Sequence, residues 1–214
     1  MKSYYIYLYR NGLTDSNLEG QYIGHTDVPL SEDGIKQIQK MKEDYEYPYV
    51  EAVFTSPLKR CTQTANIIHP DTPAIVINDL IEYNFGEYEG RTAEELKENE
   101  LFKRWLSGEA GVEPPFGESN EAFASRVSDC FIKIVDGLMK TGTTKSAIFT
   151  HGGVIMYILS AFGIPEAPMH EWMMPCGCGY AIRVTPGIWS RGRKFEVIAE
   201  APFVPQEEEE EELN

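Results

Sequence analysis

Apolar residues in this chain fall into two patterns, short continuous runs and longer stretches with helical spacing. Runs of four to eight residues that are rich in β-branched and aromatic side chains predict buried strands. The dipeptide Pro186-Gly187 lies between the last two such runs and predicts a turn. The predicted strands are residues 4–8, 51–55, 74–77, 145–150, 180–185 and 195–199.

Between most of these runs, apolar residues recur every three or four positions, which predicts amphipathic helices. Ser31 is a suitable N-cap for a helix over residues 32–45. Ser56 and Pro57 predict the cap and the first residue of a second helix. Three further helices are predicted from Thr92 to about Trp105, with Glu95 completing a capping box, from Ser119 to about Leu138, and from Val154 to Phe162.

Strands that alternate with helices predict an α/β fold, a three-layer α/β/α sandwich with a mainly parallel central sheet. Residues 1–204 are predicted to form a single domain. Residues 205–214 are predicted to be an acidic, disordered tail, because Glu207–Glu212 is a run of like charges. Active sites of such sheets lie beyond the carboxyl ends of the strands. Arg10 and His151 each follow a predicted strand and are therefore candidates for such a site.

The composition, with 42% hydrophobic and 25% charged residues, is that of an ordinary soluble globular protein. The net charge of −15 argues against nucleic acid and anionic membranes as partners. An anionic substrate would therefore need positive charge confined to a pocket. No apolar run approaches the roughly 20 residues of a membrane span, no signal peptide is recognisable, and the four cysteines are scattered. These features predict a cytoplasmic location.

Four separated segments each offer one group suited to phosphate chemistry: Arg10, Arg60, Glu82 and His151. Arginines bind phosphate oxygens in bidentate fashion, and a carboxylic acid can protonate a leaving alkoxide. Taken singly, each has a simpler interpretation. Arg60 would be a surface residue of its helix, Glu82 an ordinary loop acid, and His151 a hydrogen-bonded histidine at the end of a strand.

Together, the segments around these residues resemble the histidine phosphatase superfamily of phosphoglycerate mutase-like phosphatases. The resemblance extends over nearly the whole chain up to the glutamate run, and its motifs occur in the family's order. It implies a phosphoglycerate mutase-like fold. The matching segments are Arg10-Asn11-Gly12, Asn17, residues 20–30, Ser56-Pro57-Leu58-Lys59-Arg60 with Gln63-Thr64-Ala65, residues 80–90, Gly117-Glu118-Ser119 with Arg126, and Thr150-His151-Gly152-Gly153.

The resemblance implies a two-step phosphoryl transfer without a metal or a cofactor. In the family, a histidine at the position of Asn11 attacks phosphorus, and water then hydrolyses the phosphohistidine. Glu82 would protonate the leaving oxygen and then help to activate water, which near neutral pH requires a raised pKa. The groups implied to bind phosphate are the side chains of Arg10, Asn17, Arg60 and His151 and the backbone N–H groups near Ile23, Gly24 and Gly152.

Two positions depart from the family pattern. Leu13 stands where many members have glutamate, and Asn11 stands at the nucleophile. The nitrogen of a carboxamide is a poor nucleophile because its lone pair is delocalised into the carbonyl group. We therefore expect that this chain does not form the phosphoenzyme. An engineered His-to-Asn replacement is the preferred explanation, and a natural non-catalytic phosphate-binding relative is the alternative.

Phosphatase activity is predicted in preference to phosphoglycerate mutase activity. The segment between Gly90 and Gly117 is modest in length, and the acid loop that begins at Glu82 resembles phosphatase members more than mutases. The expected ligands are phosphate and a small phosphorylated metabolite. Residues 24–30 are similar to members that act on α-ribazole phosphate, and sugar or phosphoserine phosphatases share much of this pattern. A homodimer is left open.

Several other residues are not assigned a function. Cys176 and Cys178, with His170 nearby, lack a fourth ligand and the usual spacing of a structural zinc site, so free thiols are preferred. His25 is close enough to the first motif to line the mouth of the pocket. Trp105 and Trp172 are expected to pack in the interior, although Trp172 is also a candidate for contact with a leaving group.

Overall fold

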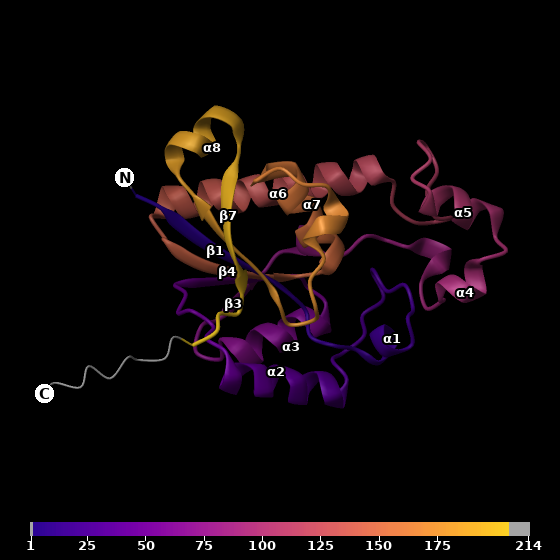
Figure 1. Ribbon diagram of the computed structural model, residues 1–214, viewed down its shortest axis with the longest axis horizontal. Helices are drawn as coiled ribbons and strands as arrows, with labels where there is room; N and C mark the ends of the chain where they lie inside the picture. The colour runs from indigo at the N-terminus through magenta and orange to yellow at the C-terminus, as the bar shows by residue number, and fades with distance from the viewer. Residues whose placement is uncertain (1, 206–214) are drawn as a thin grey trace, which may run out of the picture.

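A seven-stranded sheet runs through the centre of the molecule (Figure 1). The computed structural model describes residues 2–205. In the order β3-β2-β4-β1-β6-β7-β5, neighbouring strands are parallel except that β6 is antiparallel to both β1 and β7. The predicted α/β fold with a mainly parallel sheet is confirmed. The strands are β1 (Tyr4–Arg10), β2 (Ala52–Thr55), β3 (Ala74–Val76), β4 (Lys145–Thr150), β5 (Gly163–Ile164), β6 (Gly179–Val184) and β7 (Phe195–Ala201).

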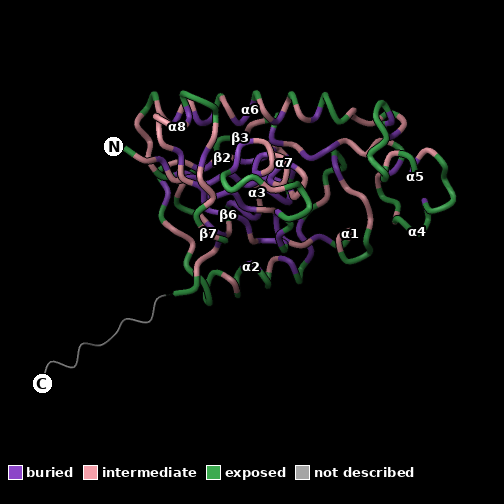
Figure 2. Tube along the Cα trace, turned by 45° about the horizontal axis from the view of Figure 1, so that its top comes forward, coloured by how far each residue is buried: buried purple, intermediate pink, exposed green. Residues whose placement is uncertain are grey.

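Strand β1 is covered by helices on both faces, which explains its continuous apolar sequence. Ile6 and Leu8 belong to the core beneath α6 (Asn120–Thr141) and α7 (Gly152–Phe162). Tyr7 and Tyr9 belong to the core beneath α2 (Glu32–Asp44) and α3 (Lys59–Ile68). Successive side chains of a strand point to opposite faces, so one strand supplies both cores. Figure 2 shows the buried chain gathered between the two helical layers.

The start of α3 differs from the prediction. Ser31 caps α2 as expected, because its hydroxyl accepts a hydrogen bond from Gly34 N at 2.9 Å. Ser56 and Pro57, however, precede α3, whose N-cap is Leu58 without a side-chain hydrogen bond. The Ser56 hydroxyl lies instead 2.8 Å from His151 Nε2, so a tertiary contact replaces the local cap.

The single helix predicted from Thr92 to Trp105 is wrong, because the segment forms two helices. The Thr92–Glu95 capping box is present and starts α4 (Ala93–Leu96). Asn99 then accepts hydrogen bonds from Leu101 N and Phe102 N and starts α5 (Glu100–Leu106). We call residues 86–106 the α4–α5 lobe, which projects from one end of the molecule (Figure 1) around a small core of Tyr88, Leu96 and Phe102.

Three further boundaries differ from the predictions. Pro186-Gly187 is no turn but opens α8 (Pro186–Gly192), because proline is preorganised for the first helical position. Helix α7 begins at Gly152, two residues before the predicted start at Val154. A short helix that was not predicted, α1 (Asp15–Leu18), follows the first loop. The remaining elements are the 3-10 helices η1 (Asn78–Leu80), η2 (Gly86–Tyr88) and η3 (Met169–Trp172).

The predicted acidic tail lies almost wholly outside the described residues, since residues 206–214 are not among them. The single-domain assignment stays a prediction. Within residues 2–205, no helix has both the length and the apolar character that crossing a bilayer requires.

Candidate active site

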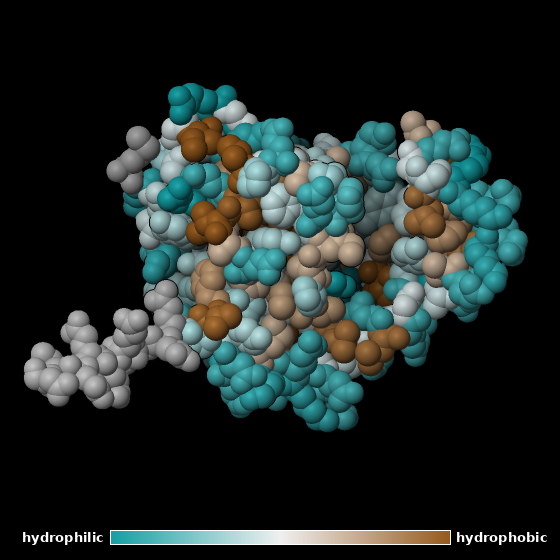
Figure 3. All heavy atoms as spheres, in the orientation of Figure 1, coloured by the Kyte–Doolittle hydropathy of each residue, from teal (hydrophilic) through white to brown (hydrophobic). Residues whose placement is uncertain are grey.

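The carboxyl ends of β1 and β4 lie side by side and bring the first and last motifs together. Arg10 pairs with Thr150 in the parallel register of these strands, and His151 follows directly. A cavity of about 630 Å³ lies at this edge of the sheet, and we call it the phosphate cavity. Figure 3 shows the surface hollowed between the main body and the α4–α5 lobe. The predicted site residues that line the cavity are Arg10, Asn11, Asn17, Ile23, Arg60, Glu82, His151 and Gly152.

Asn11 has a backbone held from two directions. Its N–H donates to Thr150 O of β4 at 2.9 Å, and its carbonyl accepts from Gly177 N at 3.2 Å. The residue is 5% exposed, and its Nδ2 donates to the carbonyl of Gly12 at 2.8 Å. These backbone hydrogen bonds fix the main chain at residue 11 without the carboxamide. Another side chain at this residue would therefore begin from the same Cα position.

Arg60 is a buried cation with a fixed orientation, not the surface residue of the simpler interpretation. Its Nη1 donates to Thr26 O at 2.9 Å, and its Nη2 donates to Gly24 O at 2.7 Å. Its Nε donates to His151 Nδ1 at 3.3 Å. Burial lowers the pKa of Arg60 from its ordinary value, yet a guanidinium group stays charged in proteins. One N–H on each Nη remains available for a phosphate oxygen.

Gly24 differs from the prediction, because it does not line the phosphate cavity. It contributes a carbonyl that orients Arg60, where a backbone N–H facing the substrate was predicted. A Cβ atom at Gly24 would lie 1.8 Å from Tyr83 O, so a side chain cannot be accommodated there without a backbone shift.

His151 has a partner at each ring nitrogen. Nδ1 accepts from Arg60, so Nε2 carries the proton and donates to the Ser56 hydroxyl at 2.8 Å. Burial, reinforced by the charges of Arg60 and Arg10, holds the pKa of His151 well below its ordinary value. The acceptor role of Nδ1 requires the neutral form of the ring. To bind phosphate, Nε2 must exchange the Ser56 hydroxyl for a phosphate oxygen.

Glu82 has its carboxyl group fixed by two backbone donors. Oε1 accepts from Tyr83 N and Oε2 accepts from Gly153 N, both at 2.9 Å. Burial raises the pKa of Glu82 from its ordinary value, although these two hydrogen bonds and the nearby arginines act in the opposite direction. A Cβ atom at Gly153 would lie 2.5 Å from Oε1, so the glycine is needed for this contact. The raised pKa is what a general acid near neutral pH requires.

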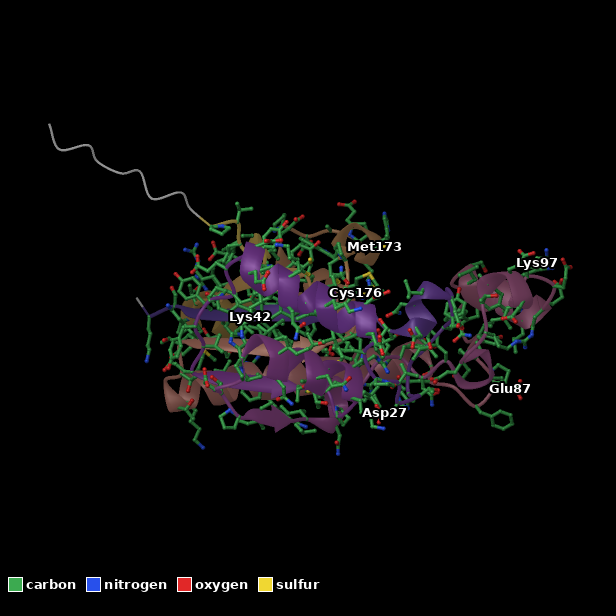
Figure 4. The ribbon with its side chains drawn as sticks, turned by 90° about the horizontal axis from the view of Figure 1, so that it is seen from below. Asp27, Lys42, Glu87, Lys97, Met173 and Cys176 are labelled. Atoms are coloured by element: carbon green, nitrogen blue, oxygen red, sulfur yellow. The ribbon has the colours of Figure 1, made fainter. Side chains whose placement is uncertain are left out.

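The two remaining side chains that were predicted to bind phosphate are Asn17 and Arg10. Asn17 Oδ1 accepts from the backbone N–H and the hydroxyl of Thr14, which closes a capping box at the start of α1. Its amide nitrogen is therefore the atom suited to donate to a ligand. Arg10 Nη1 donates to Met174 O at 2.8 Å, which orients the guanidinium from the segment before β6. Figure 4 shows Met173 and Cys176 on that segment.

A model of the histidine phosphatase superfamily (branch 1) matches residues 6–193 of this chain. The chain belongs to this superfamily. By family resemblance it is a phosphatase, and its predicted phosphoglycerate mutase-like fold is confirmed.

Named relatives agree with this membership. The chain is 28% identical to an adenosylcobalamin/α-ribazole phosphatase of Salmonella typhimurium over 187 residues, which cover 85% of this chain and 91% of the relative. It is 33% identical to 2,3-bisphosphoglycerate-dependent phosphoglycerate mutase 2 of Gloeobacter violaceus, covering 70% and 71% of the two chains. The crystal structure of an α-ribazole phosphatase from Shigella flexneri superimposes with a TM-score of 0.79 at 24% identity, covering 95% and 99%.

In this histidine phosphatase fold, Glu89 has a positioning role that the sequence did not reveal. Its carboxylate accepts from the backbone N–H groups of His25 and Thr26, both at 2.7 Å, and it also contacts the Thr26 hydroxyl. The carbonyls of Gly24 and Thr26 in the same loop orient Arg60. Glu89 lies in the acid loop that resembles the family, but nothing local to its sequence indicates a partner 63 residues away.

His25, Trp172 and Cys176, which were not assigned a function, do not line the phosphate cavity. His25 was expected near the cavity mouth but is not among the lining residues, and its backbone N–H donates to Glu89. Trp172 packs edge-on against Tyr180 at 5.5 Å in the core, as expected. Cys176 is buried beside Asn17, with Sγ 3.9 Å from Oδ1. Within residues 2–205, no three His, Cys, Asp or Glu side chains are grouped as metal ligands.

Arg126 and Glu118 hold the segment that carries Glu82. Arg126 donates to Asp79 O at 2.8 Å, to Ile81 O at 2.9 Å and to Glu82 O at 3.3 Å. Glu118 fixes the same guanidinium group through two hydrogen bonds of 2.9 and 2.8 Å. This ion pair is largely buried, and its geometry determines where the backbone of Glu82 lies.

Replacing Arg126 by methionine in an Asn11→His background should therefore slow hydrolysis of an alkyl phosphate by roughly 10- to 100-fold, because the acid is displaced from the leaving oxygen. An aryl phosphate, whose leaving group needs no proton, should lose much less. Rates for both esters, measured side by side, test this. The matched control is Arg104→Met, which removes the exposed ion pair with Glu109. An equal loss for both esters would contradict a positioning role.

Proposed function

We propose that this chain has the site of a phosphatase for small phosphomonoesters, disabled by Asn11 at the position of the nucleophile. The observation that supports the proposal is the convergence of Arg10, Arg60 and Glu82 on the cavity that Asn11 also lines. Two guanidinium groups suit a phosphate dianion, and a carboxyl group with a raised pKa suits the protonation of an alkoxide.

The proposed reaction divides the work among these residues. Arg10 and Arg60 hold the equatorial oxygens and offset the charge of the transition state. In members with the nucleophilic histidine, phosphorus passes from the ester to that ring, and Glu82 gives its proton to the departing oxygen. Glu82 then accepts a proton from the water that hydrolyses the phosphohistidine. In this chain the first step stops, because the Asn11 nitrogen has no free lone pair.

The charge of the cavity supports a phosphatase over a mutase. Among the described residues that line it, Arg10 and Arg60 are the only arginines, and lysine does not occur. A phosphoglycerate carries a carboxylate beside its phosphate and would need a further cation. Much of the remaining lining is apolar, with Phe85, Met156 and Met173 among it. A monophosphate with an uncharged remainder fits this lining, and α-ribazole 5′-phosphate is a substrate of that kind.

The origin of Asn11 has two explanations in this proposal. An engineered His-to-Asn replacement would keep every other group of the site and trap a ligand without turnover. A natural phosphate-binding relative would keep the cradle for binding alone. A cytoplasmic location and a homodimer stay predictions.

A panel of phosphate esters assayed on the Asn11→His protein tests the proposed activity. We expect release of inorganic phosphate from uncharged alkyl and nucleoside-like esters, with little conversion between 2- and 3-phosphoglycerate. Phosphate release and phosphoglycerate isomerisation are measured in parallel, by a colorimetric assay and by ³¹P NMR. Isomerisation that exceeds phosphate release would make the protein a mutase and contradict the proposal.

A further inference from the structure

A second cavity, of about 560 Å³, lies next to the phosphate cavity. We call it the aromatic cavity, because Tyr83, Phe85, Trp105, Phe123 and Tyr157 line it. These rings contact one another edge-on or at a tilt, with centroid distances of 5.3 Å for Tyr83–Phe85, 5.9 Å for Phe85–Trp105 and 5.8 Å for Phe123–Tyr157. It is built by the acid loop, the α4–α5 lobe, α6 and α7.

The two cavities meet at the acid, where they share part of their lining. Glu82, Phe85, Gly153 and Met156 line both of them. In phosphoryl transfer, the attacking and leaving groups lie roughly in line on opposite sides of phosphorus. If Glu82 protonates the leaving oxygen, the rest of the alcohol extends past Glu82 and away from Asn11. The aromatic cavity begins there.

The side chains that line the aromatic cavity indicate which kind of ligand it can bind. Glu82 is the one acidic residue among the described residues that line it, and arginine, lysine and histidine are absent from this lining. An anionic alcohol would find no cation there. Besides Glu82, the lining side chains that could hydrogen-bond a sugar are Asn120 and the polar atoms of Tyr83, Tyr157 and Trp105. An uncharged planar ring, in contrast, can pack against the surrounding aromatic faces and edges.

We propose that the aromatic cavity is the subsite for the leaving alcohol and that it takes an uncharged aromatic ring system. The substrate class is then phosphomonoesters whose alcohol bears such a ring. This inference rests on the proposed function, because it takes Glu82 as the acid and the neighbouring cavity as the phosphate site.

The chain as it stands, with Asn11, is suited to a binding test because ester turnover is not expected. Isothermal titration compares inorganic phosphate, ethyl phosphate and 1-naphthyl phosphate. Burial of the naphthyl ring should make 1-naphthyl phosphate bind roughly 10- to 100-fold more tightly than ethyl phosphate. If phosphate itself does not bind, the proposed function fails. If phosphate binds but the two esters bind equally, the subsite alone fails.

Filling the cavity locates the ring. Ala124 lines the aromatic cavity from α6, whereas Ala122 on the same helix is exposed and lies outside the lining. Ala124→Leu should remove the preference for 1-naphthyl phosphate and leave the affinity for phosphate within about twofold, and Ala122→Leu should change neither. If Ala124→Leu does not fold, Met169→Trp fills the same cavity from η3. An unchanged preference in a folded, filled variant, or an equal loss for phosphate, would overturn the proposal.

Discussion

Replacing Asn11 by histidine is expected to raise hydrolysis of 4-nitrophenyl phosphate by about 10⁴-fold or more, an effect of the size seen when a covalent nucleophile is removed from other hydrolases. The remaining groups are already in place. Residue 11 is held through its backbone by Thr150 and Gly177, and Arg10 and Arg60 line the same cavity. The replacement therefore supplies a nucleophilic ring nitrogen without any need to rebuild the site.

Two measurements make this expectation specific. Steady-state rates give the gain, and quenching in alkaline denaturant after addition of radiolabelled substrate traps the phosphohistidine, whose P–N bond is labile in acid and stable in base. Only the Asn11→His protein should form it. Asn11→Gln is the matched control, because it changes the size of the side chain and keeps the carboxamide, and it should stay inactive. A folded Asn11→His protein without activity would favour the natural binding relative over a disabled enzyme.

The second large effect is expected at Glu82. In the Asn11→His protein, Glu82→Gln should lower the rate for an alkyl phosphate by about 10²- to 10³-fold, because an alkoxide needs a proton to leave. The rate of phosphoenzyme formation from 4-nitrophenyl phosphate should fall far less, since nitrophenolate leaves without one. Single-turnover rates for both esters isolate this step. The control is Glu87→Gln, an exposed acid of the same loop that lies out on the lobe in Figure 4.

In the Asn11→His protein, the raised pKa of Glu82 predicts how the hydrolysis rate of an alkyl phosphate depends on pH. Burial raises the pKa of Glu82 above its ordinary value of 4.5. The protonated form is the active one in the first step, so the alkyl phosphate rate should be high below this raised pKa and fall as the pH rises through it. Glu82→Gln should abolish that limb of the pH profile. An identical limb in both proteins would mean that another group provides the proton.

The alternation of short apolar runs with helical stretches was sufficient to predict most of the fold. Predictions of helix ends from neighbouring residues are correct where the capping side chain has no distant partner. Ser31 is an example, because its hydroxyl caps a helix that begins at the next residue. They fail where a distant group competes for the same atom. Ser56 has the right side chain for a cap, but its hydroxyl is engaged by His151. Pro186 is compatible with a turn and with a first helical position, so the dipeptide alone does not determine which forms, and in the structure it begins α8.

By itself, the sequence determined the family, the order of its motifs and the amide at position 11, because each depends only on which residue occupies which place. The tertiary structure alone decided how those residues act on one another. In the structure, Arg60 is buried and donates to two carbonyls of a loop far away in the chain. Glu82 accepts hydrogen bonds from two backbone N–H groups. Arg126 donates to the backbone of the segment before Glu82. Hydrogen bonds and desolvation depend on distances in space, and those distances exist only after strands β1 and β4 have paired.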